Sequence, residues 1–200
     1  MVDEERRLVV AAQRGDVESF NALVRQYEGR VYNLCYRMLG DAESAADAAQ
    51  DAFLSAFRNL HSFRGGSFRS WMLRIATNTC YDVLRARKRR PAVSLDNPLD
   101  DEDEAARLQI ADRAEAPDEF ALRRELAAAI QRGLALLPEE QRLILILSDI
   151  QGLTYDEIAQ ITNTNLGTVK SRLSRGRARL RDILKAGELL PMRYRHEGDG

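Results

Sequence analysis

The stretch LTYDEIAQITNTNLGTVKSRLSRGRARLRDIL, residues 153–184, is the most informative part of the chain. Thr154 is a favourable N-cap, and Glu157 three residues later completes a capping box, so we predict a short helix from this point. Residues 163–165, Asn-Thr-Asn, should interrupt it, because Asn tolerates turn and left-handed conformations. A longer helix is predicted from about Leu166. Its apolar residues lie on one face: Val169, Leu173, Leu180 and Ile183.

The predicted second helix is strongly basic, with no acid before Asp182. Two helices, a short turn and a basic second helix are typical of a helix-turn-helix, whose second helix enters the major groove of duplex DNA. The simpler alternative is a solvated basic face or a site for an acidic partner. The cations outside the apolar face are Lys170, Arg172, Arg175, Arg177, Arg179 and Arg181.

Composition indicates a globular all-α protein. The 200 residues allow one large domain or two small ones, and the content of 44% hydrophobic and 30% charged residues suits a soluble chain. Long helical periodicities without alternating strand patterns predict an all-α fold. The net charge of −1 conceals a basic run at residues 85–90 and an acidic run at residues 100–104. Such segregation suggests separate electrostatic roles within one chain.

Several classes of function are not indicated by the sequence. Cys35 and Cys80 both fall in apolar helical patterns, so we expect two reduced core thiols and neither a disulfide nor a metal site. We find no nucleophile–base pair, no metal-ligand spacing and no phosphate-binding Gly-rich loop, and therefore expect no catalysis, metal or cofactor. With no signal-peptide pattern and no run of 18 apolar residues, we expect a cytoplasmic protein without membrane insertion.

The part of the chain before Pro91 is predicted to form a small helical domain. Gly15 and Gly40 should end its first two helices, and Asp41 should cap the third. The third helix combines small buried alanines with an acidic outer face. That face is either a partner surface or a solvated face with favourable acids in its first turn. Its members are Asp41, Glu43, Asp47, Gln50 and Asp51.

A glycine-containing loop with two phenylalanines is predicted at residues 61–68, before a helix that ends in the basic run. Aromatic rings and arginines together suit a single-stranded nucleic acid, because bases stack on the rings while cations follow the phosphates. Asn78 lies one turn beyond Arg74, so the two share a face. The alternative is that Phe68, Trp71 and Tyr81 only fill the domain core.

The rest of the chain supplies a linker and a second helical domain. Residues 92–117 are acidic and lack apolar periodicity until Leu108, so this segment should be extended and could imitate a nucleic acid backbone. Asp118 should cap the next helix, and the apolar residues 142–150 should be central to the second core. We expect domains at 1–91 and 118–185, a linker at 92–117, and a tail at 186–200 of no indicated role.

Four stretches, in this order, resemble the extracytoplasmic-function (ECF) group of bacterial RNA polymerase sigma factors. DAAQDAF, residues 47–53, resembles the acidic helix that binds the clamp helices of the largest polymerase subunit. FRSWMLRIATN, residues 68–78, resembles the helix that opens the minus-ten element. LPEEQR, residues 137–142, resembles the start of the fourth sigma region, and GTVKSRL, residues 167–173, its recognition helix.

The resemblance implies a sigma factor that binds core RNA polymerase at its clamp helices and flap, recognises promoter DNA and is controlled by an anti-sigma factor. It implies core polymerase contacts by Asp47, Gln50 and Asp51. It implies minus-ten DNA contacts by Phe63, Arg64, Phe68, Trp71, Arg74 and Asn78. On the recognition helix, the base readers expected from the exposed face are Lys170, Ser171, Ser174 and Arg175. The expected phosphate contacts are Thr168, Arg172, Arg177 and Arg179.

Two other classes of protein stay open at this level. A helix-turn-helix repressor or response regulator would need a dimer interface, a ligand pocket or a phosphoacceptor, none of which the sequence indicates. A nucleic-acid enzyme such as a recombinase would need a nucleophile or a carboxylate cluster. Asp100, Asp101 and Asp103 lie in the expected linker, which suits preorganised chemistry poorly.

Overall fold

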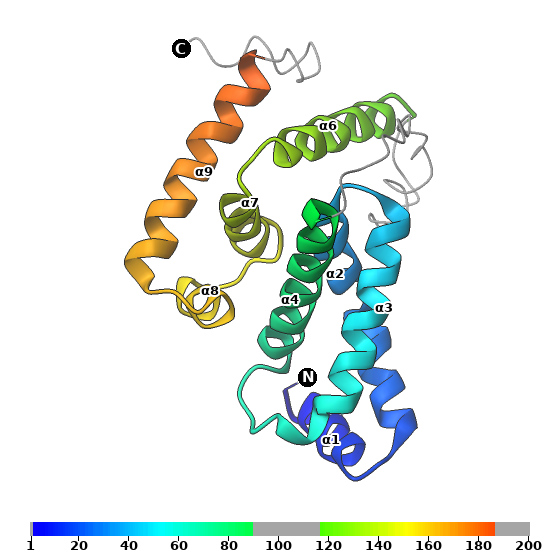
Figure 1. The fold of residues 1–200 in the computed structure, drawn as a ribbon. Helices are drawn as coiled ribbons and strands as arrows, with labels where there is room; N and C mark the ends of the chain where they lie inside the picture. Colours follow the sequence, from blue (N-terminus) through cyan, green and yellow to red (C-terminus); the bar gives the residue numbers. More distant parts are fainter. Residues whose placement is uncertain (1, 90–116, 187–200) are drawn as a thin grey trace. The chain divides into compact units, whose positions relative to one another are not determined.

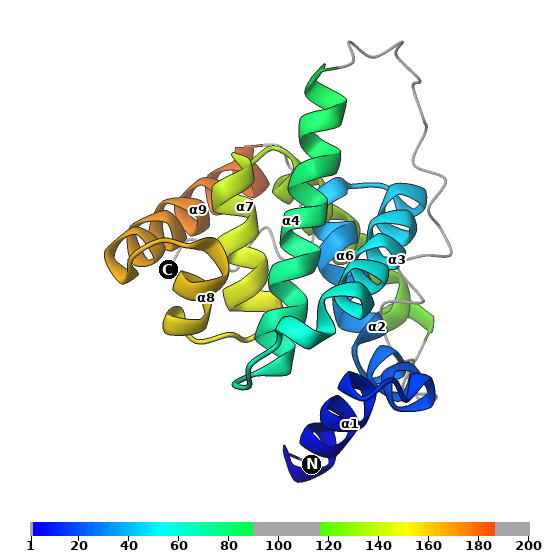
Figure 2. The same ribbon diagram turned by 60° about the horizontal axis from the view of Figure 1, so that its bottom comes forward.

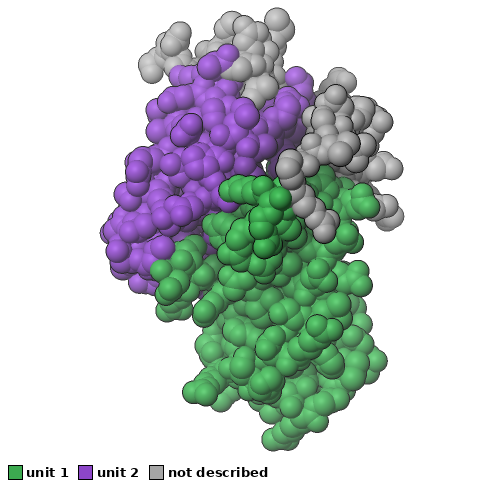
Figure 3. Space-filling view, viewed as in Figure 1, with its two compact units in different colours: residues 1–91, 160–163 green, residues 92–159, 164–200 purple. Residues whose placement is uncertain are grey.

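The computed structural model describes residues 2–89 and 117–186, and every regular element in these ranges is a helix. The predicted all-α fold is confirmed. The acidic segment 92–117, apart from Pro117, and the tail from residue 187 lie outside the described residues. The chain divides into two compact units, residues 1–91 with 160–163 and residues 92–159 with 164–200 (Figure 3). Within the described ranges, no helix combines the length and apolarity needed to cross a membrane.

Unit 1 contains α1 (Val2–Gln13), α2 (Val17–Leu39), α3 (Ala42–Asn59), a 3₁₀ turn η1 (Leu60–Ser62) and α4 (Phe68–Arg89). Helices α2, α3 and α4 pack against one another, and α1 packs on α2 (Figure 1). The predicted helix ends are confirmed. Asp16 accepts a hydrogen bond from the Glu18 amide, and Asp41 accepts one of 2.8 Å from the Ser44 amide. Gly40 ends α2 at a φ of 87°, where residues with a side chain are strained.

The core of unit 1 forms along the predicted apolar stripe of α2. Leu23, Val31 and Leu34 are at most 1% exposed, and the alanines of α3 let the facing helices approach closely. Cys35 and Cys80 are both buried and free, as predicted. Hydrogen bonding with Cys80, together with burial, raises the pKa of the Cys35 thiol, which therefore stays protonated.

Arg87 fixes the basic end of α4 to the junction between α2 and α3. Its guanidinium donates to the Leu39 carbonyl oxygen at 2.9 Å, to Asp41 Oδ2 at 2.6 Å and to Ser44 Oγ at 2.6 Å. The neighbouring Arg85 pairs with Asp82 on the same helix. At least part of the basic run therefore holds unit 1 together, a role that its composition did not indicate.

Unit 2 contains α6 (Pro117–Ala135), α7 (Glu139–Leu145), a π-helical turn η2 (Ile146–Ile150), the first five residues of α8 (Tyr155–Thr162) and α9 (Leu166–Ala186) (Figure 2). Helix α6 begins at Pro117, so Asp118 lies in its first turn and does not precede it as predicted; proline favours the first helical position. The apolar segment after Arg142 is the core, as expected. Residues 143–147 are at most 4% exposed, although Ile150 is 40% exposed.

Close helix crossings orient α9 in unit 2. A Cβ added at Gly176 would lie 3.2 Å from Leu145 of α7, and one at Gly133 of α6 would lie 2.7 Å from Leu180 of α9. Both glycines therefore allow close packing that a larger residue would disturb. The buried Arg142 donates to the carbonyl oxygens of Ala135 at 2.6 Å and Leu137 at 3.2 Å, which satisfies the end of α6.

Candidate nucleic-acid interface

The helix-turn-helix has the local hydrogen bonds that its sequence predicts. The amide and hydroxyl of Thr154 each donate to Glu157 Oε2 at 2.9 Å, and the Glu157 amide donates back to Thr154 Oγ1 at 3.3 Å. The capping box is thus confirmed. Asn163 adopts a φ of 50°, the left-handed conformation expected at the turn. Asn165 Oδ1 accepts a 2.8 Å hydrogen bond from the Thr168 amide and so caps α9.

Helix α9 separates its buried and exposed faces as predicted. Val169 and Leu173 are at most 2% exposed. The four expected base readers, Lys170, Ser171, Ser174 and Arg175, are all exposed. Arg175 Nε donates to the Ser171 carbonyl oxygen at 3.2 Å, so in the structure its guanidinium lies back along the helix.

Two arginines expected to hold phosphates are paired with carboxylates of unit 2. Arg177 donates to both oxygens of Asp149, at 2.6 and 3.0 Å, and Arg172 forms a 2.5 Å ion pair with Glu140. The hydrogen bonds from Arg177 hold the pKa of Asp149 below its ordinary value, so the carboxylate is charged at neutral pH. These arginines connect α9 to α7 and η2. To bind DNA, each guanidinium would have to leave its carboxylate partner and bind a phosphate instead.

A shallow groove of about 500 Å³ runs between the start of α8 and α9. It contains the cations Lys170, Arg177 and Arg181 with the hydroxyl-bearing Tyr155 and Ser174. Hydroxyl and cationic donors around a groove suit a phosphate backbone. Tyr155, the first residue of α8, borders the same groove.

In unit 1, three aromatic rings form a cluster where the 61–68 loop meets α4. The ring centroids are 5.6 Å apart for Phe63 and Phe68, 5.4 Å for Phe63 and Trp71, and 5.5 Å for Phe68 and Trp71. Phe68 is 2% exposed and also packs on Tyr27, whereas Phe63 and Trp71 are half-buried. Phe68 therefore fills the core, which was the alternative at this position, and supports the two rings that reach the surface.

The loop itself is held in place by α1. Gln13 Nε2 donates to the carbonyl oxygens of Leu60 at 3.0 Å and Phe63 at 2.8 Å. Gly65 and Gly66 both have φ near 90–100°, conformations that favour glycine. Between α1 and this loop lies a hollow of about 660 Å³, within the size range of small-ligand sites. Its loop side includes Phe63 and Arg64.

The remaining expected site residues are exposed. Arg74 and Asn78 follow Trp71 along the outer side of α4. Asp47, Gln50 and Asp51 lie on the surface of α3. Leu54, one turn after Asp51, is 45% exposed and so adds an apolar centre to this acidic row.

Sequence reasoning missed three residues that shape these surfaces: Gln13, Glu140 and Asp149. Each acts on a residue far away in the chain, and nothing in its immediate sequence marks that partner. In the sequence Glu140 is only part of the LPEEQR motif, and an acid at this place in a first helical turn is common. The spacing of Leu54 after Gln50 and Asp51 was the one available signal for an apolar centre on α3.

Comparison with known proteins identifies the class. The family Sigma-70 region 2 matches residues 23–90, and Sigma-70, region 4 matches residues 127–180. One match falls in unit 1, and the other contains the helix-turn-helix, so the fold and its DNA-reading element define a sigma-70-type transcription initiation factor. The chain belongs to the ECF RNA polymerase sigma factors, because it is similar to members of that group over most of its length. Its function is promoter-specific initiation of transcription.

Individual relatives cover nearly the whole chain. It is 39% identical over 180 residues to RNA polymerase sigma-H factor of Pseudomonas aeruginosa, covering 88% of this chain and 91% of that protein. It is 36% identical over 182 residues to ECF RNA polymerase sigma factor SigW of Bacillus subtilis, covering 90% and 96%. Among solved structures, CnrH in complex with the cytosolic domain of CnrY has a TM-score of 0.64 at 26% identity, covering 92% and 98%. These matches favour the sigma family over the repressor and nucleic-acid enzyme alternatives.

Proposed function

We propose that unit 1, residues 1–91, captures the opened minus-ten strand while residues 118–185 read the minus-thirty-five duplex, with residues 92–117 as the linker. The observation that carries this division is the exposed row of Arg74 and Asn78 beside the surface rings Phe63 and Trp71. The chain acts by binding and not by catalysis, inside the cell where the DNA is. Its partners are core RNA polymerase, promoter DNA and an anti-sigma factor.

Capture of the minus-ten strand would use different groups for different parts of a nucleotide. The Asn78 amide can both donate to and accept from a base edge, and Arg74 and Arg64 can hold neighbouring phosphates. Phe63 and Trp71 border the surface where an expelled base could stack, and Phe68 fixes their positions from below. Unstacking a base costs a few kcal/mol, which stacking contacts of about 1–3 kcal/mol per base offset.

Reading of the minus-thirty-five duplex would place the exposed face of α9 in the major groove. Lys170, Ser171, Ser174 and Arg175 then meet base edges, while Thr168 and Arg179 contact phosphates. Arg172 and Arg177 join these phosphate contacts by leaving their carboxylate partners. The Arg177–Asp149 pair is exposed on both sides, and such pairs hold only about 0–1 kcal/mol, so Arg177 can exchange at little cost, whereas Arg172 is more buried.

Binding to core polymerase would use the surface of α3. Asp47, Gln50 and Asp51 supply a polar rim with negative charge, and the exposed Leu54 supplies an apolar anchor. Interfaces commonly combine a buried anchor with such a rim. The clamp helices of the largest subunit are the proposed partner of this surface, and the flap is the proposed partner of unit 2.

The test uses Asn78→Ala in holoenzyme reconstituted with core polymerase, on a promoter from which the wild type starts transcription. We expect the variant to fold, to join the polymerase and to bind minus-thirty-five duplex normally, but to fail to open the minus-ten region. A template already mismatched there should restore transcription. Gln26→Ala, which removes an exposed amide from α2, is the matched control and should behave as wild type.

The opposite pattern would refute the proposed role. If Asn78 only stabilises the domain, the variant loses thermal stability and polymerase binding together. The mismatched template then rescues nothing.

A further inference from the structure

We propose that α1 carries a second single-stranded DNA site, which binds the promoter strand where it continues from the minus-ten contact. This inference rests on the proposed function of the aromatic loop and extends it to a helix that neither the motifs nor the proposed contacts include. The site is a shallow surface groove of about 510 Å³ along α1. Its cationic and apolar residues are Arg6, Arg7, Val10 and Arg14.

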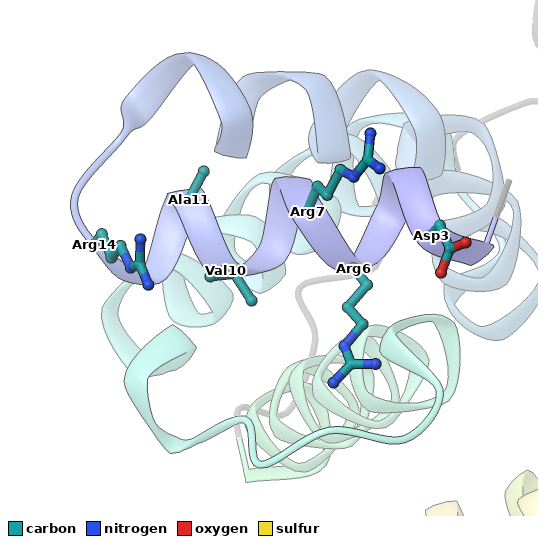
Figure 4. A pocket seen from close by; sticks show the side chains of 6 residues that line it. All are labelled: Asp3, Arg6, Arg7, Val10, Ala11 and Arg14. Carbon is teal, nitrogen blue, oxygen red and sulfur yellow. The ribbon is translucent and has the colours of Figure 1, made fainter.

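The α1 groove borders the hollow at the aromatic loop. Arg6 and Val10 line both, the hollow facing Phe63 and Arg64 on its far side. Figure 4 shows Arg6 and Val10 on one side of α1, with Arg6 extended towards α4, and Arg14 at the end of the helix. A strand that leaves the loop can therefore pass along α1, where Arg6 and Arg14 supply cations.

The chemistry of the α1 groove matches an unpaired nucleic acid strand. Arg6 and Arg14 are exposed, and among the described residues neither forms an ion pair. Val10 between them is 40% exposed and gives the groove an apolar surface beside the cations. An apolar contact for a base or sugar, flanked by cations for phosphates, is the arrangement that single-strand binders use.

Spacing and charge also fit. Arg6 and Arg14 are eight residues apart, which corresponds to about 12 Å along a helix, or about three nucleotides of a stacked strand. Two acids border the two hollows. Asp3 lies at one end of the α1 groove, and Glu5 accepts a hydrogen bond from the Tyr27 hydroxyl. The groove is lined by three arginines and one acid, Asp3, so its net charge is positive.

The test measures binding of holoenzyme to single strands carrying the minus-ten sequence of a promoter that it transcribes. One strand ends at that sequence, and the others continue by four thymidines at the 5′ or the 3′ end. We expect an extension at one end to raise wild-type affinity on the order of tenfold at about 0.1 M salt. Arg6→Gln with Arg14→Gln should lose that gain, keep the affinity for the short strand, and reduce the salt slope on the extended strand by about 1.4.

Two further variants make the result specific. Arg6→Lys with Arg14→Lys retains the charges and should retain the gain. Arg25→Gln with Arg132→Gln removes two exposed arginines from α2 and α6 and should behave as wild type. If this control loses the gain equally, the effect belongs to net charge and the α1 site is refuted. It is also refuted if neither extension raises wild-type affinity.

Failure of the proposed function gives a different pattern. In that case Asn78→Ala leaves binding of the short strand unchanged. If the short strand depends on Asn78 but extension brings no gain, only the α1 site is wrong.

Discussion

Arg175 and Arg179 lie one turn apart on α9, yet we assign them different contacts. Both are exposed, and Arg175 lies on the face with Lys170 and Ser174. We predict that Arg175→Ala changes base preference at particular minus-thirty-five positions, at about 1–3 kcal/mol for the preferred base. Arg179→Ala should weaken binding to all sequences alike and reduce the salt slope by about one. Binding to a panel of single-base variants at several salt concentrations measures both effects, and uniform losses in both variants would contradict the assignment.

Asp149 limits what Arg177 can do, because the carboxylate and a DNA phosphate compete for the same guanidinium. We predict that Asp149→Asn raises affinity for the minus-thirty-five duplex by up to about fivefold, since an exposed pair holds at most about 1 kcal/mol. Glu125→Gln, which removes an exposed acid from α6, should leave affinity nearly unchanged. Weaker binding by Asp149→Asn would show instead that the ion pair orients Arg177 for DNA.

At the scale of elements, the side chain of Arg87 fixes the end of α4 to the α2–α3 junction. Partial burial opposes ionisation of Asp41, but hydrogen bonds from Ser44 and Arg87 outweigh it and hold its pKa below the ordinary value. We predict that Arg87→Ala lowers the free energy of unfolding of unit 1 by about 1–3 kcal/mol at pH 7, because it removes hydrogen bonds to a carboxylate and a carbonyl. Arg87→Lys should recover only part of this loss, since lysine lacks the planar guanidinium that donates to several acceptors at once.

The same contact gives a pH dependence of known sign. A carboxylate whose pKa is lower in the folded state stabilises the fold above its unfolded pKa of about 3.9, and that contribution is lost as pH falls through the folded pKa. The stability difference between wild type and Arg87→Ala should therefore be constant from pH 7 to about pH 5 and narrow below about pH 4. Denaturant unfolding at each pH measures it. A difference that does not change down to pH 3 would mean that Asp41 contributes nothing.

Helix positions could be predicted from sequence because their causes are local. Asp16, Asp41 and Thr154 cap helices through amides two or three residues away, and Gly40 ends one through its own conformation. The π-helical turn after Leu145 was not predicted, since a 2.8 Å bond from the Gln151 amide to the Ile146 carbonyl oxygen leaves no mark in the apolar pattern. Contacts between residues far apart in the sequence could not be predicted either. The partner of Arg177 is 28 residues away, and Gln13 binds a loop about 50 residues away.

At the scale of the whole molecule, the separate surfaces need core polymerase to act on one promoter. The family motifs predicted residues for these surfaces, because the order of motifs along the chain can be recognised without the tertiary structure. They did not include Leu54, which the structure shows to be 45% exposed on the same helix as Asp51. An exposed leucine beside carboxylates offers a partner an apolar anchor within a charged rim.

We therefore predict that Asp51→Arg weakens binding to core polymerase and leaves the fold intact. Substitutions on an exposed helix face usually change stability by no more than about 0.5 kcal/mol, so thermal unfolding should be nearly unchanged. Reversing the charge instead places a cation where the partner surface is expected to be positive, and like charges brought together cost several kcal/mol. Competition for core polymerase against labelled wild-type protein measures the effect. Glu28→Arg on α2, which is also exposed, is the control for the change in charge. Binding of the free protein to minus-thirty-five duplex should be the same in both variants, so that a loss of transcription by Asp51→Arg alone is traced to the polymerase contact. If the folded Asp51→Arg protein competes as well as wild type, the acidic row of α3 is a solvated face and polymerase binds elsewhere.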